Sequence, residues 1–490
     1  MENEFESLLQ AAQGGDMESM AQLGNAYYFG NGVAVDYGKA MEWWSKAVEL
    51  GHTDALTNVG YLYESGKGVA VNKKKAAECY SVAGAMGYAR AQSNYAFMLE
   101  NGYGTEKNVA LAIEWYKKAA EQGQTRALRT LGFRYQDGVG TACDYEKAFE
   151  YWKQAAEQGD ATSQRAIGYC YEFGQGVEKD FNEAVAWYTR AAEQGEAIAQ
   201  TNLAFLYEQG NGVAADRAQA LYWYEQAAKN GNARAQRRLG FFYQDGNGVT
   251  QDYEKAFALW TQAAEAGEMV AQRALGYCYE KGQGVLPDRK KAEYWYEQAA
   301  RQGEETAQVN LGFFYEEEKE YEKAAGWYLA AFKSGNARAA CNLGYLYEFG
   351  LGVPKDVSRA VEFYKSAAQK GSNTAKMNLA NLYYDGEKIA QDYQAAVRLY
   401  AELMKEGDLV AANMLGECYY YGRGVEKDER NAVRCYEIAA KHGNASAQYN
   451  LGYCYYSGDG ISKNVYLAKS WLEKAAAQGN QNAIKLLNKI

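Results

Sequence analysis

Proline and histidine are scarce in this sequence of 490 residues, which contains two of each. Disordered low-complexity chains are usually rich in both proline and glycine, so 51 glycines with so little proline are expected to occupy defined positions in a folded protein. The two histidines, His52 and His442, lie almost the full chain length apart, each beside a glycine. Neither is spaced to activate a nucleophile, and we expect both to be solvated loop residues.

Paired cysteines and long apolar runs are also missing. None of the eight cysteines belongs to a Cys-x-x-Cys pair, which is typical of a reducing, intracellular compartment. No run of 18 apolar residues occurs, so the sequence predicts no membrane span. The first residues, MENEFESLLQAAQGGDMESM, lack the basic start and apolar core of a secretory signal. We therefore expect a cytoplasmic protein; export by a non-classical route leaves no such mark and stays open.

Positive charge is in deficit, because the net charge is −10. This excess of acid argues against broad binding to nucleic acids or anionic membranes. The motifs H-E-x-x-H, G-x-S-x-G, S-x-x-K and G-x-x-x-x-G-K-[ST] are all absent. The sequence thus predicts no enzymatic activity, no cofactor and no metal site.

The chain does contain a long internal period. A Leu-Gly pair or a close variant recurs along the sequence, and we number each repeat from the second residue of this pair, which is position 0. These positions are Gly24, Gly60, Ala96, Gly132, Gly168, Ala204, Gly240, Gly276, Gly312, Gly344, Ala380, Gly416 and Gly452. Every interval is 36 residues except that from Gly312 to Gly344, which is 32. A period of this length over thirteen units indicates a repeat architecture.

Each unit is expected to be a helical hairpin. In the stretch RAQRRLGFFYQDGNGV (234–249), Ala235, Leu239 and Tyr243 share one helix face. Gly246 and Gly248 are placed to end this first helix in a turn that needs positive φ. Asp252 is then expected to cap a second helix, whose buried side holds Ala256, Leu259, Trp260 and Ala263, and which ends at Gly267. Because the glycine pair recurs with the period, we interpret it as a hairpin turn rather than a phosphate-binding loop.

One hairpin cannot bury its own apolar face, whereas stacked neighbours can. The sequence therefore predicts an all-α solenoid of about thirteen hairpins, with residues 1–490 forming a single continuous array. Residues 1–15 are expected to form an N-terminal capping helix, residues 16–480 the thirteen repeats, and residues 481–490 a C-terminal capping helix.

The pattern A-x-x-x-L-G-x-x-Y-x-x-G-x-G-V-x-x-D-x-x-x-A-x-x-W-Y-x-x-A-A-x-x-G resembles the Sel-one-like repeat family, which is related to the tetratricopeptide repeats. The resemblance covers essentially the whole chain. It implies a right-handed superhelix in which the first helices line a concave face. It also implies an adaptor or scaffold that binds a protein or peptide, and it indicates no substrate.

Binding residues are expected at first-helix positions that the core does not use. At 100° per residue, positions −3, +1 and +4 point nearly opposite the packing face. These positions, together with asparagines at −2, carry aromatic, arginine, amide and acidic side chains, which are suited to holding an extended peptide. The resulting candidates are Arg129, Arg165, Arg237 and Arg273 at −3, Phe133, Tyr169, Phe205, Phe241, Tyr277 and Phe313 at +1, Asn202 and Asn310 at −2, and Gln244 and Glu280 at +4.

Other interpretations of these positions stay open. The +1 aromatics could pack between repeats, the asparagines could be structural, and the arginines could pair with the +4 acids of the same face. The four tyrosines at +4, clustered mainly in repeats 11–13, could form a second binding region. The function predicted is a scaffold with a protein or peptide partner and no nucleic-acid partner. A secreted effector and a glycan-binding or regulatory repeat protein are the alternatives, and the sequence gives no oligomeric state.

Two repeats depart from the pattern. Repeat 9 is four residues shorter, with Glu316–Glu320 in place of the glycine turn. This is either a bend in the solenoid or a tolerated deletion, and we favour the deletion. Repeat 11 has Gly386-Glu387-Lys388, without the second glycine.

Overall fold

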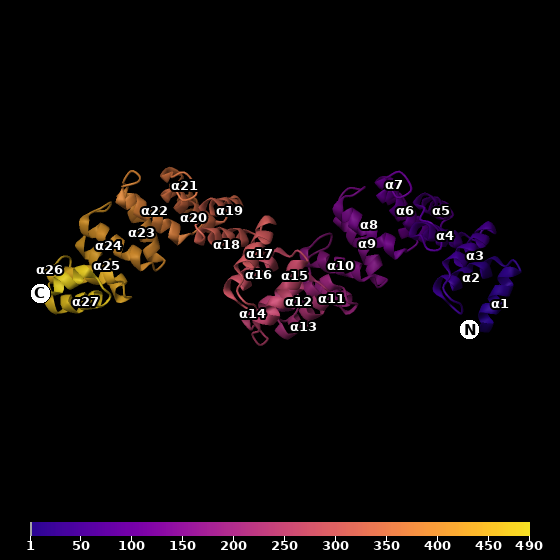
Figure 1. Ribbon diagram of the computed structural model, residues 1–490, viewed down its shortest axis with the longest axis horizontal. Coiled ribbons are helices and arrows are strands. Elements are labelled where there is room, and N and C mark those ends of the chain that lie inside the picture. Colours follow the sequence, from indigo (N-terminus) through magenta and orange to yellow (C-terminus); the bar gives the residue numbers. More distant parts are fainter. Residues whose placement is uncertain (1) are drawn as a thin grey trace. The chain divides into compact units, whose positions relative to one another are not determined.

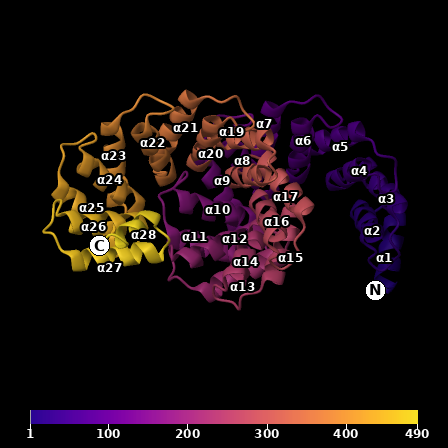
Figure 2. The same cartoon turned by 60° about the vertical axis from the view of Figure 1, so that its left-hand side comes forward.

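The computed structural model describes residues 2–490, with side chains from Phe5 onward, and this part of the chain is helical without strands (Figure 1). The chain forms two compact units, Met1–Asp252 and Tyr253–Ile490. Within each unit every helix packs against the next one along the chain, and consecutive helices lie side by side in both views (Figures 1 and 2). The prediction of an all-α solenoid built from helical hairpins is confirmed.

The first unit begins with α1 (Glu2–Gln13), which packs against the first repeat. Its first helices are α2 (Met17–Phe29), α4 (Thr53–Ser65), α6 (Ala89–Asn101), α8 (Thr125–Asp137), α10 (Ala161–Phe173), α12 (Ala197–Gln209) and α14 (Ala233–Asp245). Its second helices are α3 (Tyr37–Glu49), α5 (Lys73–Ala85), α7 (Val109–Glu121), α9 (Tyr145–Glu157), α11 (Phe181–Glu193) and α13 (Arg217–Lys229).

The second unit ends with the short helix α28 (Gln481–Leu487), which packs against the last repeat. Its first helices are α16 (Met269–Lys281), α18 (Glu305–Glu317), α20 (Ala337–Phe349), α22 (Asn373–Asp385), α24 (Leu409–Tyr421) and α26 (Ala445–Ser457). Its second helices are α15 (Tyr253–Glu265), α17 (Arg289–Arg301), α19 (Tyr321–Lys333), α21 (Val357–Gln369), α23 (Tyr393–Lys405), α25 (Glu429–Lys441) and α27 (Val465–Ala477). That the whole chain acts as one continuous domain stays a prediction.

The helix ends lie where the sequence predicts them. Gly246 follows α14 with φ 66°, a left-handed conformation that glycine adopts without strain. At the start of a second helix, the side chain of Asp144 accepts a hydrogen bond from the backbone N–H of Lys147 at 3.0 Å. The first helix of the same repeat is capped similarly, because the side chain of Gln124 accepts from the backbone N–H of Ala127.

The glycine at position 0 marks the closest contact inside a hairpin. A Cβ atom on Gly276 would lie 2.5 Å from the ring of Tyr296, the fully buried aromatic residue at position +20. The alanine at position −5 is also fully buried, as at Ala235, and Leu239 is 4% exposed. The Leu-Gly pair is therefore the packing seam of the hairpin, and the aromatic ring fills the space that a side chain at position 0 would occupy.

The second glycine of the turn packs against the preceding repeat. Gly248 has φ 81°, and a Cβ atom there would lie 2.6 Å from the Cδ atom of Arg217, the first residue of α13. The turn is thus filled by protein from the neighbouring hairpin, and this supports its interpretation as architecture.

A buried glutamine at position −4 links three consecutive helices. The Nε2 atom of Gln200 donates to the carbonyl oxygen of Ala192 on the preceding hairpin at 3.0 Å, and its Oε1 atom accepts from Asn230 at 3.1 Å. Gln92, Gln164, Gln272 and Gln448 make the same pair of hydrogen bonds. In repeat 9 the second partner is replaced by the short side chain of Ser334, and Oε1 of Gln308 has no partner.

The shortened repeat 9 keeps its hairpin. Helices α18 and α19 have the usual length of 13 residues, and Lys319 adopts the left-handed conformation (φ 61°) that glycine adopts elsewhere. Arg289 at the start of α17 stacks on Phe314 at 4.3 Å and forms an ion pair with Glu318. The deletion is therefore absorbed within the turn, which supports the prediction that it is tolerated.

Candidate partner-binding site

Position +4 holds a carboxylate that is hydrogen-bonded within its own hairpin. The Tyr188 hydroxyl donates to Glu172 at 2.7 Å, and the Tyr296 hydroxyl donates to Glu280 at 2.7 Å. The same bond joins Glu64 with Tyr80, Glu100 with Tyr116, Glu208 with Tyr224, Glu316 with Tyr328 and Glu348 with Tyr364. The candidate Gln244 belongs to a repeat with tryptophan at +20, which has no hydroxyl to donate. The +4 acids therefore hold the two helices of a hairpin together.

Tyrosines at +4 make a different link, to the turn of the next repeat. The Tyr28 hydroxyl lies 3.0 Å from Nζ of Lys67, and the Tyr420 hydroxyl donates to Asp459 at 2.7 Å. Arg423 donates to the hydroxyl of Tyr384 in the same way. The hydrogen bond from Lys67 lowers the pKa of Tyr28 below its ordinary value. These tyrosines thus connect successive repeats.

Three of the arginines at −3 are engaged with the next repeat, so for these three the alternative of pairing with the +4 residue of their own face is wrong. Arg129 forms an ion pair with Asp160 at 2.7 Å, and Arg165 forms one with Glu196 at 3.4 Å. Arg273 pairs with Glu304 at 3.2 Å. Each of these acids caps the N-terminus of the following first helix. The reason is that position −3 lies near the N-terminal end of its helix, beside the start of the next repeat.

Glu172 provides a pH test of this hairpin link. Burial raises the pKa of Glu172 above its ordinary value, an effect that the hydrogen bond from Tyr188 opposes. The unfolded chain keeps a carboxyl pKa of about 4.3. A raised folded-state pKa means that the folded state binds more protons in this range, so stability falls as pH rises from about 4 through the folded-state pKa.

We therefore expect the urea unfolding midpoint of the wild type to fall relative to that of Glu172→Gln as the pH rises from about 4 to 7. Glutamine still accepts the Tyr188 hydroxyl proton but does not ionise. Glu178→Gln, at an exposed turn position, serves as the control. Wild-type and Glu172→Gln curves that run parallel across this range would show that ionisation of Glu172 does not affect folding.

The aromatic residues at +1 divide into two classes. Phe133 and Phe313 pack edge-on against the buried second-helix rings of their own hairpins, Trp152 and Tyr328, with ring centroids 5.1 Å and 5.8 Å apart. Phe205 is 45% exposed, whereas Tyr169 is half-buried, with its ring tilted against that of Phe173 one turn further along α10 at a centroid distance of 4.5 Å. Phe241 and Tyr277 are half-buried. The two ring contacts of Phe133 and Phe313 therefore lie within a hairpin and not between repeats, whereas Phe205 keeps aromatic surface in solvent.

The asparagines at −2 are hydrogen-bonded to neighbouring repeats. Asn202 hydrogen-bonds the hydroxyl of Tyr188 in the preceding repeat, whereas Asn310 is half-buried. Asn58 accepts a hydrogen bond from Arg90, and Asn94 accepts one from Arg126 at 3.4 Å. A structural role is therefore established for some of these amides.

Two further repeat positions, which were not predicted from the sequence, also belong to the first-helix face. Position −6 carries Arg90, Arg126, Arg234 and Arg338, all exposed. Position +5 carries Phe29, Phe173, Phe349 and Tyr421, which are 48–65% exposed. The signal was available, because −6 and −2 are one helical turn apart, and so are +1 and +5. The outward face is therefore −6, −2, +1 and +5.

This face is hollowed in the first unit. A cavity of about 580 Å³ is lined mainly by α2, α4, α6 and the start of α8. Its lining residues are Asn25, Tyr28, Phe29, Trp44, Asp54, Asn58, Tyr61, Arg90, Asn94, Gln124 and Arg126. In the second unit a smaller cavity of about 250 Å³ lies on α20 and α22, with Tyr345, Phe349 and Lys388 in its lining. The hollow side of each unit therefore includes first-helix residues.

The comparisons with known proteins agree with this architecture. The family model described as "Sel1 repeat" matches thirteen segments, at residues 18–52, 53–88, 89–124, 125–160, 161–196, 197–232, 233–268, 270–304, 306–336, 337–372, 374–408, 409–444 and 445–480. The chain belongs to the Sel1 repeat family.

Solved Sel1 repeat structures resemble the chain over long stretches. The protein c5321, described as a protective antigen present in uropathogenic Escherichia coli strains and displaying an SLR fold, is 31% identical. The match covers 98% of this chain and 97% of that one, with a TM-score of 0.74. A Sel1 repeat protein from Oxalobacter formigenes is 34% identical and covers 51% of this chain and 100% of its own, with a TM-score of 0.46. No curated protein matches the chain.

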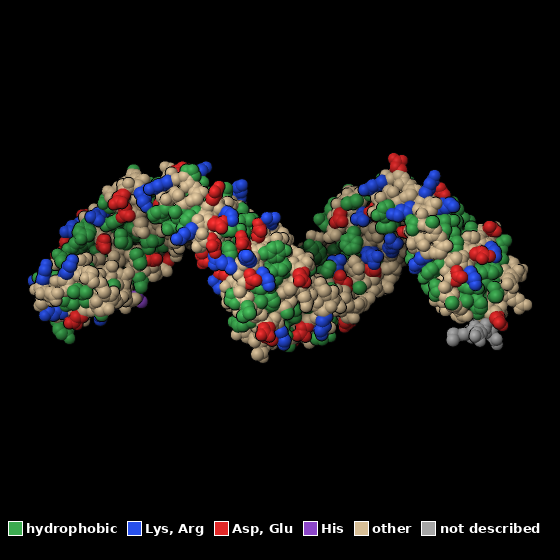
Figure 3. Space-filling model, in the orientation of Figure 1, with side chains coloured by type: hydrophobic (Ala, Val, Ile, Leu, Met, Phe, Trp, Pro, Cys, Tyr) green, Lys and Arg blue, Asp and Glu red, His purple; other side chains and the backbone are tan. Residues whose placement is uncertain are grey.

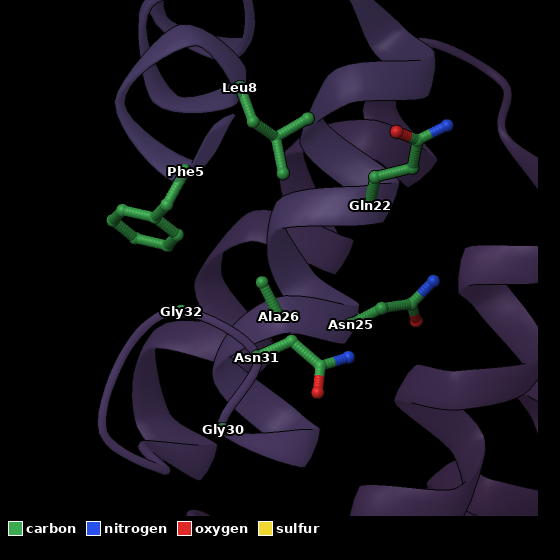
Figure 4. A pocket seen from close by; sticks show the side chains of 8 residues that line it. All are labelled: Phe5, Leu8, Gln22, Asn25, Ala26, Gly30, Asn31 and Gly32. Atoms are coloured by element: carbon green, nitrogen blue, oxygen red, sulfur yellow. The ribbon is translucent and has the colours of Figure 1, made fainter. Parts of the chain in front are cut away.

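A further hollow lies at the N-terminal end of the Sel1 array. Phe5 and Leu8 of α1 face Ala26 and the turn at Gly30–Gly32 across a space of about 540 Å³ (Figure 4). Gln22 and Asn25 of α2 also line it. Among the described residues that line it, the polar side chains are amides and none is ionisable.

The cysteines and histidines are the side chains of these Sel1 repeats that are best suited to nucleophilic attack or metal binding. All eight cysteines are free, and burial raises the pKa of Cys170 to about 12. His52 is half-buried rather than a solvated loop residue, because its Nδ1 atom caps α4 by accepting from the backbone N–H of Ala55. His442 is exposed. Among the described residues, no group of three histidine, cysteine or acidic side chains is placed to hold a metal ion, and no described helix is long and apolar enough to cross a membrane.

Proposed function

We propose that this chain is a non-enzymatic scaffold that binds an extended segment of another protein on the first-helix face of its repeats. Solenoids of this type are generally protein-interaction scaffolds. The observation that carries the proposal is the cavity on α2, α4 and α6, which is lined by aromatic, amide and guanidinium groups. Aromatic and arginine side chains dominate the energetics of protein interfaces, and amides can pair with a peptide backbone.

The candidate contacts are the members of the face that keep some surface in solvent. Phe205 is exposed, and Tyr169, Phe241, Tyr277 and Asn310 are half-buried. In this proposal Arg129, Arg165 and Arg273 fix the relative positions of successive first helices. On the face seen in Figure 3, acidic and basic side chains are intermixed, so recognition is assigned to local groups rather than to one sign of charge.

A site-specific cross-linking experiment tests the proposal. The photoreactive amino acid benzoylphenylalanine replaces Phe205 on α12 or Tyr345 on α20, both exposed first-helix residues. Matched controls carry it at Tyr222 on α13 or Tyr294 on α17, which are similarly exposed on second helices. We expect the same protein to be cross-linked from a first-helix position and not from the second-helix controls. Capture from the second helices alone would overturn the proposal, and capture of no protein would favour the glycan-binding alternative.

A secreted effector is the second candidate, and one comparison favours it. The similar protein c5321 is described as a protective antigen. The same binding face would then act outside the producing cell. Fractionation of producing cells, with the chain detected in the culture medium or only with a cytosolic marker, distinguishes this candidate from a cytoplasmic scaffold.

A further inference from the structure

Arginines occupy position −6 in two adjacent repeats of the first unit. Arg90 on α6 and Arg126 on α8 are both exposed and both line the cavity. Their neighbours at the same position are Asp54 in repeat 2 and Thr162 in repeat 5. Elsewhere in the sequence an arginine at −6 stands alone, as at Arg234 and Arg338. Two guanidinium groups one repeat apart thus face the same cavity.

Contacts with neighbouring residues orient both guanidinium groups. Asn58 accepts a hydrogen bond from Arg90, and Asn94 accepts one from Arg126. The Arg126 guanidinium also lies over the ring of Phe97 at 5.0 Å. A guanidinium has five N–H donors, and these contacts use one from each group. The remaining donors are in a geometry that matches a carboxylate.

The acidic groups nearby leave the cavity with an excess of positive charge. The carboxylates at +4, Glu64 and Glu100, each accept a tyrosine hydroxyl, and Glu100 also pairs with Arg134. Neither lines the cavity, where Asp54 is the carboxylate among the lining residues. With two arginines and one aspartate, the lining of the cavity is net positive, whereas the chain as a whole has a net charge of −10. An anionic segment of a partner is therefore attracted to this cavity more strongly than to the rest of the protein surface.

The wall beside the arginines is aromatic. Phe29 is 65% exposed and Tyr61 is 40% exposed, and both line the same cavity. Lys67 lies 5.6 Å from the ring of Tyr61 and donates to Tyr28, so the tyrosines are held in place by the turn of repeat 2. An apolar side chain next to a carboxylate would bury this exposed ring surface.

We propose that this cavity binds an acidic, extended segment of the partner protein, with a carboxylate at Arg90 and Arg126 and an adjacent apolar side chain against Phe29 and Tyr61. The proposal deepens the proposed function and rests on it. The carboxylate is that of an aspartate or glutamate side chain, which the guanidinium groups bind through paired N–H donors.

Fluorescence anisotropy with the full chain tests the proposal. The probe is a fluorescein-labelled peptide of repeated Glu-Leu-Gly units, compared with its glutamine and lysine analogues, each with a free or an amidated C-terminus. We expect the glutamate peptide to bind at least about tenfold more tightly than either analogue. Retention of that preference after amidation assigns the site to side-chain carboxylates, whereas an affinity that all three peptides share and lose on amidation would assign it to the chain terminus and overturn the proposal.

The Arg90→Gln and Arg126→Gln double variant is expected to lose this preference, while Lys153→Gln, which removes an exposed positive charge from second helix α9, keeps it. Circular dichroism melting verifies that the variants fold alike. Equal affinity for the glutamate and glutamine peptides in the wild type would overturn the proposal, as would preferential binding of a single-stranded oligonucleotide. Because cross-linking from Phe205 or Tyr345 does not depend on acidic probes, its success alongside failure here would leave the scaffold function standing.

Discussion

Replacing Trp152 with alanine is expected to lower the free energy of unfolding by about 3–5 kcal/mol. Trp152 is 2% exposed and fills the seam beside Gly132, where its ring also packs against Phe133. Its indole N–H has no hydrogen-bond partner, so the loss comes from packing and from the cavity left behind. Urea unfolding followed by circular dichroism measures the change.

The repeat architecture makes this effect local. In a solenoid each hairpin contacts only its neighbours, so hydrogen exchange should accelerate most in α8 and α9 and little near α1. Trp152→Phe is the control, because it keeps most of the ring and removes the unpartnered N–H. A loss of protection spread evenly over the chain, or a Trp152→Ala change below about 1 kcal/mol, would contradict this account of the seam.

The fold was predictable because the recurring residues are those that pack. The Leu-Gly pair, the alanine at −5 and the aromatic residue at +20 meet in one seam, and such contacts repeat with the same 36-residue period as the sequence. The two turn glycines were equally predictable from the sequence, because a positive φ and a close approach of another backbone both favour a residue without a side chain. These features depend on spacing alone.

The candidate site was predictable only in part. The angular position of a residue around its own helix does not specify which residue of the next repeat it contacts. The angle placed Arg129 and Arg165 outward, but their partners are the capping acids of the following helices. Such contacts depend on how successive repeats stack, which spacing within one repeat does not give. By contrast, the contact of Tyr169 with the exposed Phe173 joins residues one helical turn apart and could have been found from the sequence.

The missing glycine of repeat 11 gives a second large prediction. Lys388 stands at this turn, and its Nζ atom lies 2.6 Å from Glu348 Oε1 in the preceding repeat and 4.4 Å from the Phe349 ring centroid. Glu348 is 7% exposed and also accepts the Tyr364 hydroxyl at 2.9 Å. Lys388→Met removes the cation that pairs with this buried carboxylate. We expect it to destabilise the second unit by about 2–4 kcal/mol, measured by urea unfolding.

A double-mutant cycle separates the charge from the shape of this turn. Glu348→Gln keeps an acceptor for the Tyr364 hydroxyl but no longer needs a cation, so adding Lys388→Met to it should cost about 1 kcal/mol or less. The coupling between the two changes is then the cost of leaving the buried carboxylate unpaired. Equal losses from Lys388→Met in both backgrounds would show that the turn conformation matters and the ion pair does not. A strong coupling would explain why this repeat departs from its glycine pattern: the lysine at the turn neutralises Glu348, whereas some other +4 acids pair with an arginine or lysine from a different position.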